Sequence, residues 1–286
     1  MGPLIGVLFD GFAYGMLLFL LSVGLSETLG MMNFVNLAHC AFAMFGGYVT
    51  VTLMNDMGWP FFAAIPIAFI ATAAVSVAFE RTLYRRLYNA GELDHVLLTI
   101  GLAFISVATA AYIFGTLQQP IQTPSYLRGS INFWGVNVGV YRLFLVMTGL
   151  LVAALLVLAL EYTRFGARVR AAVDNQRMAR GLGINVDAAF AITFALGIGL
   201  AGLGGALAIE IVGLDPSFAF LFLVYVLIIV SVGGLGSIWG SFVAAALIGV
   251  SDVAGKYYVP EIGAFLIYLV MLVLLMWRPQ GLFGRR

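Results

Sequence analysis

Long apolar runs that follow one another along the whole chain are the feature that most restricts how it can fold. A helix that crosses the hydrocarbon core of a bilayer needs about 20 apolar residues, and runs of this kind recur from the first residues to the last. Charged residues make up only 9% of the 286 residues, whereas a soluble domain carries about 25%. Because so little charge cannot cover a water-facing surface, the sequence predicts an all-α polytopic membrane protein. A β-barrel is not expected, because its strands alternate apolar and polar residues.

The apolar runs predict eight to nine membrane segments within a single transmembrane domain, residues 1–286. We expect them at 4–26, 33–54, 60–79, 95–115, 139–160, 187–212, 218–235, 240–255 and 261–277. The count is eight if 33–54 or 240–255 is re-entrant or fused to a neighbour. The first run lacks a basic region before it and a small-residue cleavage site, so we interpret it as a retained helix.

Basic residues predict the orientation of these segments. They gather in three clusters, which are Arg81, Arg85 and Arg86, then Arg164, Arg168, Arg170, Arg177 and Arg180, and finally Arg278, Arg285 and Arg286. Alternating spans bring the three clusters to one side, which the positive-inside rule makes cytoplasmic. The N-terminus is then outside and the C-terminus inside, with an external loop at 116–138 and a cytoplasmic loop at 161–186.

The basic loop 161–186 has helix-forming residues and no proline between Ala171 and Leu182, so we expect a short amphipathic helix there. The loop is either an ordinary determinant of topology or a coupling helix that docks on a partner. The next segment favours the second interpretation, because Gly197, Ala201 and Gly205 form a small-residue stripe that allows close helix packing. The sequence has no Gly-x-x-x-x-Gly-Lys-Ser/Thr phosphate loop. If ATP drives the protein, another chain supplies the ATPase.

Three blocks of the sequence resemble the permease subunits of branched-chain amino acid ABC importers. They are Asn36-Leu-Ala-His-Cys-Ala-Phe-Ala-Met-Phe-Gly-Gly-Tyr48; Thr163-Arg-Phe-Gly166 with Arg170, Asn175, Ala179 and Gly183-Ile-Asn-Val186; and Gly233-Gly-Leu-Gly-Ser-Ile-Trp-Gly240. The chain is most similar to the shorter, H-type subunit of that family. The resemblance implies a type II-like ABC importer transmembrane domain in a bacterial inner membrane. It also implies a second homologous permease, two cytoplasmic ABC ATPases and a periplasmic binding protein as partners.

The same resemblance makes the cytoplasmic loop the element that couples the permease to the ATPase. The residues assigned to this role are Arg164, Phe165, Gly166, Arg168, Arg170, Asn175, Arg177, Arg180 and Gly183. ATP and Mg²⁺ are expected on the ATPase chains, and this chain is expected to hold no cofactor, no catalytic residue and no nucleic acid. A metal site is not expected either, because His39, His95 and Cys40 are the only soft ligands.

Polar residues and glycines at the start of two apolar segments are the candidates for contact with a transported solute. They are Asn33, Asn36 and His39 in one segment and Gly233, Gly234, Gly236 and Ser237 before another, with Asp252 as a candidate interior polar contact. A helix start presents free N–H groups and a positive dipole end, which suit a carboxylate. Ser237 is a plausible N-cap. The alternative is that these residues only cap and pack helices at a cytoplasmic turn.

The acidic residues near the spans divide into an interior candidate and boundary residues. Because a charge at membrane depth costs about 2.5–3.5 kcal/mol, we expect Asp10 and Glu27 at the interfaces of the first span and Glu80 at a solvated cytoplasmic boundary. The family pattern has glycine and then often an acidic or polar residue after the histidine, where this chain has Cys40 and Ala41. Urea, short amides and aromatic or other organic acids therefore stay open as substrates beside branched-chain amino acids, unless the partner permease supplies the missing groups.

Two other functional classes stay open at this point. Ser237 with His39 or His95 has the residue types of a serine nucleophile and its base, but the turn lacks the Gly-x-Ser-x-Gly elbow. A channel or carrier that needs no ATPase is the other class. The external loop 116–138 carries aromatic residues that either receive a binding protein or lie at the bilayer interface.

Overall fold

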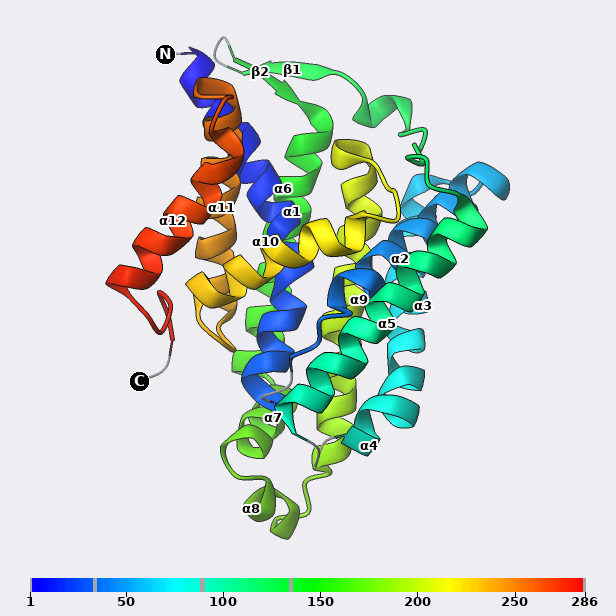
Figure 1. The fold of residues 1–286 in the computed structure, drawn as a ribbon, viewed down its shortest axis with the longest axis vertical. Helices are drawn as coiled ribbons and strands as arrows, with labels where there is room; N and C mark the ends of the chain where they lie inside the picture. The colour runs from blue at the N-terminus through cyan, green and yellow to red at the C-terminus, as the bar shows by residue number, and fades with distance from the viewer. Residues whose placement is uncertain (1, 33–34, 88–90, 134–135, 285–286) are drawn as a thin grey trace.

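The computed structural model describes residues 2–32, 35–87, 91–133 and 136–284, which form a bundle of tilted apolar helices (Figure 1). Within these residues, six helices are long and apolar enough to cross a membrane: α1 (Gly2–Met32), α3 (Phe61–Phe79), α5 (Glu92–Phe114), α6 (Val140–Tyr162), α9 (Val186–Val212) and α11 (Ile238–Tyr258). Three shorter helices are α2 (His39–Val51), α10 (Phe218–Gly233) and α12 (Gly263–Trp277). Each of the nine predicted segments therefore contains a helix, while the number that crosses the membrane stays a prediction.

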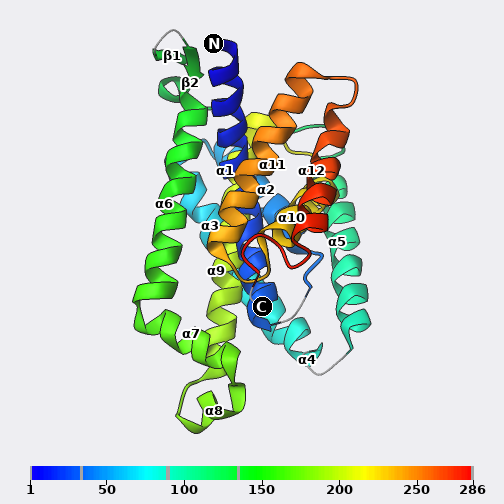
Figure 2. The same ribbon diagram turned by 90° about the vertical axis from the view of Figure 1, so that its left-hand side faces the viewer.

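The remaining elements are short and connect these helices. They are the π-helical segments η1 (Thr52–Asp56) and η2 (Glu80–Tyr84), α4 (Arg85–Leu87), the 3₁₀ turn η3 (Ser125–Leu127), the strands β1 (Ser130–Phe133) and β2 (Val136–Gly139), α7 (Arg164–Asp174) and α8 (Gln176–Gly181). The strands form an antiparallel hairpin in which Ser130 pairs with Gly139. The hairpin lies with the N-terminus at one end of the bundle, here called the upper end, and α7 and α8 lie at the opposite, lower end (Figure 2).

Helix α1 forms the centre of the bundle and contacts α6, α9, α10 and α11. Its middle is buried on all sides, from Gly15 to Thr28. Glycines permit this packing, since a Cβ atom built on Gly24 would lie 2.0 Å from the carbonyl oxygen of Gly197 in α9. One built on Gly15 would lie 2.8 Å from the carbonyl oxygen of Ala245 in α11. The small-residue stripe predicted in α9 is thus a site of close helix contact.

Helix α2 begins beside the middle of α1 and not at its lower end. The imidazole Nε2 of His39, its first residue, lies 2.9 Å from the carbonyl oxygen of Leu21. Leu21 is eleven residues before Met32, the last residue of α1, which corresponds to about 16 Å along the helix axis. The predicted segment 33–54 therefore contains a helix that starts within the bundle. The 13 residues of α2 extend about 20 Å, less than the thickness of a hydrocarbon core.

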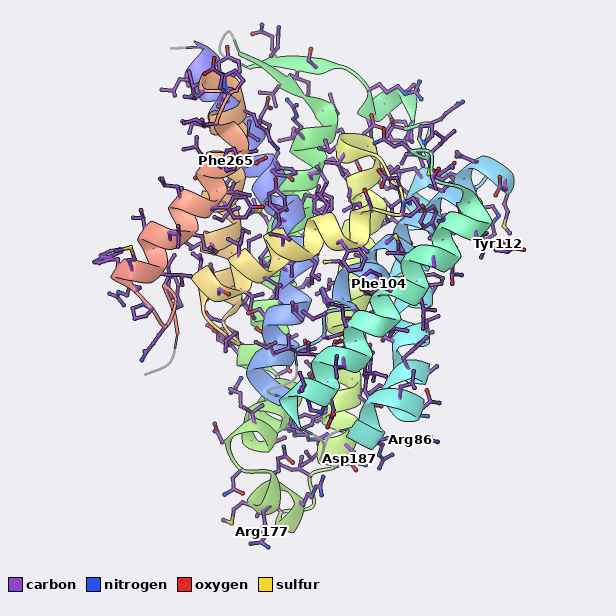
Figure 3. The ribbon with its side chains drawn as sticks, viewed as in Figure 1. Arg86, Phe104, Tyr112, Arg177, Asp187 and Phe265 are labelled. Atoms are coloured by element: carbon purple, nitrogen blue, oxygen red, sulfur yellow. The ribbon has the colours of Figure 1, made fainter. Side chains whose placement is uncertain are left out.

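The outer helices present a belt of apolar side chains. Phe104 and Tyr112 on α5 and Phe265 on α12 point outward, and Tyr112 is 91% exposed (Figure 3). The labelled charged residues Arg177 and Asp187 lie at the lower end, away from this belt (Figure 3). An apolar belt that ends in a charged region is the pattern expected of a helical bundle surrounded by lipid.

One prediction about an acidic residue near the spans is wrong, because Glu80 is buried and not solvated. Glu27 is also buried by the protein, and its position at the membrane interface stays a prediction. Tyr84, the other buried residue of the same π-helical segment, packs edge-on against Phe194 of α9 with ring centroids 5.4 Å apart, so one side of this segment faces the protein interior. The position of a residue relative to a span boundary in the sequence does not show whether another helix buries it.

The predicted external loop is more structured than a simple connector. Besides η3 and the hairpin, it forms an isolated bridge in which the backbone N–H of Gln119 donates to the carbonyl oxygen of Leu214 at 2.7 Å. A cavity of about 700 Å³ lies beside this loop, with Trp59, Pro60, Pro124 and Tyr126 in its lining.

Candidate functional site

The start of α2 is a buried polar site in contact with the middle of α1. Asn36 and His39 are both fully buried. The side-chain oxygen of Asn36 accepts from the backbone N–H of Ala38 at 3.1 Å and from the hydroxyl of Tyr84 at 3.4 Å. Asn36 Nδ2 and His39 Nδ1 have no hydrogen-bond partner among the described residues. This site therefore combines unsatisfied polar atoms with a helix start deep in the bundle. Asn33 lies outside the described residues.

The turn between α10 and α11 packs on the lower part of α1. Its backbone reaches α1 because Gly234 and Gly236 adopt positive φ angles of 95° and 71°, which favour glycine. The N–H of Gly236 donates to the carbonyl oxygen of Ser26 at 3.1 Å. The hydroxyl of Ser237 accepts from the N–H of Gly240 at 3.0 Å, which confirms the predicted N-cap of α11. Gly233 packs directly against the backbone of Gly240 across the turn.

A cavity of about 290 Å³ joins this turn to the predicted coupling loop. Gly236 and Ser237 line it from the turn, Glu27 from α1 and Arg170 from α7. The carboxylate oxygen Oε1 of Glu27 has no hydrogen-bond partner among the described residues. The structure thus places residues from two separate predicted groups around one space at the lower end of the bundle.

The predicted coupling loop forms two helices where we expected one. The expected helix from Ala171 to Leu182 is interrupted at Asn175, whose backbone is extended. The side chain of Asn175 accepts from the N–H of Met178 at 3.0 Å and so begins α8. Asparagine side chains compete with helical hydrogen bonding in this way. We expected one continuous helix because the segment has no proline, and that argument did not consider the asparagine. Thr163 caps α7 by accepting from the N–H of Gly166.

Helices α7 and α8 are held to the start of α9 by a small apolar core of their own. Ala172, Ala179, Val186 and Phe190 are its buried members. This core is separate from the main one around α1. The two short helices therefore have a fixed position relative to α9 and, through α9, relative to the centre of the bundle.

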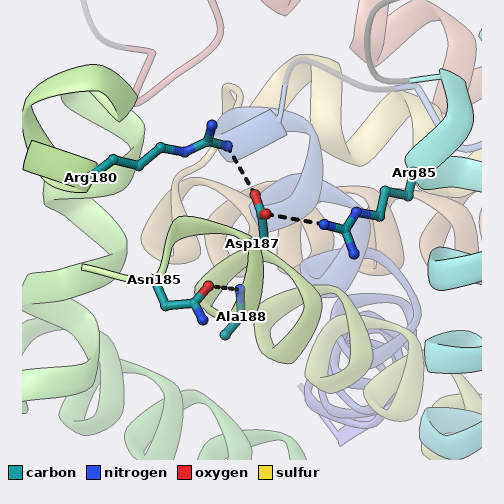
Figure 4. Close-up of polar contacts among 5 residues, drawn as sticks. All are labelled: Arg85, Arg180, Asn185, Asp187 and Ala188. Atoms are coloured by element: carbon teal, nitrogen blue, oxygen red, sulfur yellow. Dashed lines mark hydrogen bonds and ion pairs between the residues drawn. The ribbon is translucent and has the colours of Figure 1, made fainter. Parts of the chain in front are cut away.

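Ion pairs add to this attachment at the first turn of α9. The carboxylate of Asp187 lies 2.9 Å from the guanidinium of Arg180 and 3.3 Å from that of Arg85 (Figure 4). Asn185 caps the helix by accepting from the N–H of Ala188 at 2.9 Å (Figure 4). A carboxylate in the first turn also suits the helix dipole. Sequence reasoning did not identify Asp187, although its position two residues after an N-cap asparagine is a recognisable signal.

The outer surface of α7 and α8 is basic and partly apolar. Its exposed arginines are Arg164, Arg168, Arg170, Arg177 and Arg180. Because the sequence predicts that they contact an ATPase, we refer to them as the coupling surface. Phe165 is half-buried, Gly166 is buried, and Gly183 adopts a φ of 80° in the turn after α8. Met178 and Leu182 are exposed beside the arginines and were not among the predicted residues. Exposed apolar side chains on a charged element are typical of a contact surface for another protein.

Asp252 lies apart from the other predicted path residues. It is fifteen residues after Ser237 in α11, about 22 Å along the helix axis, and contacts Lys256 and Tyr225. Within the described ranges, no group of three or more His, Cys, Asp and Glu residues is arranged to hold a metal ion. The structure therefore forms a lower site from the turn and the coupling loop, a middle site at Asn36 and His39, and a separate upper site at Asp252.

Comparison with known proteins connects this arrangement to a family. The chain is 26% identical over 294 residues to the high-affinity branched-chain amino acid transport system permease protein LivH of Escherichia coli K12, covering 97% of this chain and 94% of LivH. It is 27% identical over 295 residues to the corresponding protein BraD of Pseudomonas aeruginosa, covering 97% of this chain and 95% of BraD.

A similar fold is present in a solved structure, PsaBC from Streptococcus pneumoniae in complex with Fab. The TM-score is 0.51 at 13% sequence identity, covering 96% of this chain and 92% of the other. The model of one family, described as the permease component of branched-chain amino acid transport systems, matches residues 7–275. Because this match includes nearly the whole bundle and all three polar sites, the chain belongs to the branched-chain amino acid transport system permease family.

Proposed function

We propose that this chain is a permease subunit of a binding-protein-dependent ABC importer that carries branched-chain amino acids or closely related small solutes. It forms part of the translocation path and moves the solute by ATP-driven alternating access. No bond of the solute changes, so the chain acts without catalytic residues. ATP and Mg²⁺ bind to two separate cytoplasmic ATPase chains, and a second homologous permease completes the path.

The observation that carries this proposal is the link between the coupling surface and the centre of the bundle. The exposed arginines belong to helices fixed on α9 by Phe190 and its neighbours. The cavity lined by Arg170, Glu27 and Ser237 lies between these helices and the α10–α11 turn. A partner that pushes on α7 and α8 therefore acts on α9, which contacts both of these helices and also α1. This connection between α7, α8 and the centre of the bundle favours a coupling role for the loop over a role in determining topology alone.

The proposed orientation puts the lower end in the cytoplasm. The N-terminus is then outside and the C-terminus inside, and the ATPases meet the lower end. The binding protein docks at the upper end, where the cavity of about 700 Å³ beside Trp59 and Tyr126 offers an aromatic and proline-rich recess. The cluster of arginines at the lower end supports this orientation.

The proposed path includes Asn36, His39 and the turn from Gly233 to Ser237. The unpartnered atoms Asn36 Nδ2 and His39 Nδ1 support this role, because buried polar atoms without partners are rare and gain hydrogen bonds when a ligand or water reaches them. The start of α2 adds backbone N–H groups at the same depth. Replacing Asn36 by alanine is expected to reduce uptake by the reconstituted importer, and normal uptake at normal expression would remove this part of the proposal.

The coupling role is tested by co-purification with the ATPase. Arg177→Gln combined with Arg168→Gln is expected to reduce the amount of ATPase retained and to abolish ATP-driven uptake. Both arginines are exposed, and neither takes part in the ion pairs of Asp187. Arg128→Gln is the matched control, since it removes an exposed arginine from the upper end. Equal ATPase retention by the double variant and the control, or uptake by this chain alone in liposomes, would overturn the proposal.

The solute is identified by a separate measurement on the cognate binding protein. We expect it to bind leucine, isoleucine or valine more tightly than urea, short amides or aromatic acids. Tight binding of an amide or aromatic acid with no binding of branched-chain amino acids would keep the importer and replace its substrate.

A further inference from the structure

Four charged side chains line a cavity of about 200 Å³ near the upper end of the bundle, between α1, α6, α9 and α11. Asp10 of α1 forms an ion pair with Arg142 of α6. The ammonium of Lys256 lies 2.6 Å from the carboxylate of Asp252, one turn earlier in α11. The cavity is therefore neutral overall and presents both signs of charge within a small space.

Asp252 is the buried member of this group. It is 2% exposed, and its Oδ1 accepts from the hydroxyl of Tyr225 at 3.2 Å. The side chains of Lys256 and Arg142 are 54% and 44% exposed. Tyr14, which also lines the cavity, packs edge-on against the ring of Tyr225, with ring centroids 6.4 Å apart. The fixed carboxylate thus lies inside, and both cations can reach water.

This arrangement is not explained by stability. Ion pairs whose cations are about half-exposed, as those of Lys256 and Arg142 are, contribute little to stability, because water screens them. Ionisable residues inside membrane helices are costly and usually mark a functional site. Ion pairs that lie beside an open cavity can instead exchange a protein partner for the charged group of a ligand.

We propose that this cavity binds a zwitterionic group, in which a primary ammonium and an anionic group lie a few ångströms apart. The ammonium of the ligand replaces Lys256 at Asp252, and the anionic group binds Arg142. Lys256 is the side chain that leaves, because its flexible, half-exposed chain can carry its ammonium into water. Asp252 stays in place because it is buried and held by Tyr225.

Two sources have this chemistry, a free α-amino acid and the headgroup of phosphatidylethanolamine. The free amino acid as ligand rests on the proposed function, whereas the lipid headgroup does not. The cavity of about 200 Å³ is smaller than the roughly 300–1,000 Å³ typical of sites for drug-sized ligands, which favours a small group over a larger ligand.

Binding is tested on the full chain in nanodiscs of phosphatidylglycerol, without a binding protein and without ATP. One arm titrates radiolabelled leucine at equilibrium. The other arm uses native mass spectrometry to count phosphatidylethanolamine that the chain retains from membranes containing this lipid. We expect at least one of the two to bind the wild-type chain. Because uptake is not measured, failure of this test is distinct from failure of the importer proposal.

The variants separate ligand binding from a structural role by the direction of their effects. Asp252→Asn is expected to weaken binding at least tenfold. Lys256→Gln is expected to strengthen it, because it removes the internal competitor for Asp252. Asp10→Asn combined with Arg142→Gln is expected to weaken it, because it removes the partner of the anionic group without leaving an unpaired carboxylate. Glu261→Gln, at an exposed carboxylate just beyond α11 that does not line the cavity, is the control and is expected to bind like the wild type.

The opposite direction expected for Lys256→Gln is the decisive result. If Lys256→Gln and the double variant both weaken binding, the charges serve the structure and the proposal is wrong. It is equally wrong if neither ligand binds the wild-type chain. If Asp252→Asn folds poorly, the comparison of Lys256→Gln with the double variant still decides the question.

Discussion

At the residue scale, glycine determines how closely the central helices pack. The backbones of Gly24 and Gly197 touch, so Gly24→Ala forces α1 and α9 apart. We expect Gly24→Ala to lower the free energy of unfolding by about 1–3 kcal/mol, the usual cost of overpacking. Gly101→Ala is the control, because a Cβ atom at Gly101 in α5 would meet nothing within 4 Å. Thermal unfolding of the detergent-purified variants measures both, and equal melting temperatures would contradict the predicted contact.

The side chain of Ser237 has a role that can be separated from any contact with solute. It caps α11 by accepting from the N–H of Gly240, so Ser237→Ala is expected to lower stability by about 1 kcal/mol. Ser237→Asn keeps an acceptor at the cap and is expected to stay close to the wild type. If thermal unfolding gives the same loss for both variants, the cap is not the source of the effect.

At the scale of elements, the attachment of α7 and α8 to α9 depends on a few apolar side chains. Phe190 is the largest member of their core and is almost completely buried. Phe190→Ala is therefore expected to free the two helices and to speed tryptic cleavage between Arg164 and Arg180, while the main core stays intact. Ile192→Ala is the control, because Ile192 lies on the same helix but is 49% exposed. Gel electrophoresis and mass spectrometry measure the rate of cleavage. If Phe190→Ala is cleaved at the wild-type rate, other contacts hold these helices.

Sequence patterns located the elements better than they described their ends. Apolar runs predicted every long helix, because a run of about 20 apolar residues has few alternatives in lipid. They did not predict the interruption at Asn175 or the start of α2 at His39. The first depends on an asparagine that caps a new helix, and the second on a contact with Leu21, eighteen residues earlier.

At the scale of the whole molecule, the proposed orientation predicts which surfaces face each compartment. Arg177→Cys at the lower end is expected to react with a membrane-impermeant maleimide only in inside-out vesicles. Tyr257→Cys, near the upper end of α11, is expected to react only in right-side-out vesicles. The native Cys40 is fully buried, so the wild-type chain provides an unlabelled background. The reversed pattern of labelling would mean that the upper end faces the cytoplasm.

The candidate sites were predicted to different extents. The spacing of three blocks indicated the permease family, which the match over residues 7–275 confirms. The cap at Ser237 follows from its own sequence neighbourhood. The cavity between Arg170 and the α10–α11 turn, and the pairing of Asp10 with Arg142, join residues far apart in the chain. A local sequence pattern cannot predict contacts between residues that are so far apart in the chain.

The sequence by itself determined the class of protein, the positions of its helices and the basic end of the bundle. These properties depend on how much apolar surface and charge each segment carries, and both are read along the chain. Only the tertiary structure decided that α2 starts beside the middle of α1, that the predicted coupling loop and the α10–α11 turn share a cavity, and that Asp252 belongs to a separate charged site. These properties depend on which helix faces pack together, and glycine contacts such as that of Gly24 with Gly197 fix that choice through close approach of backbones.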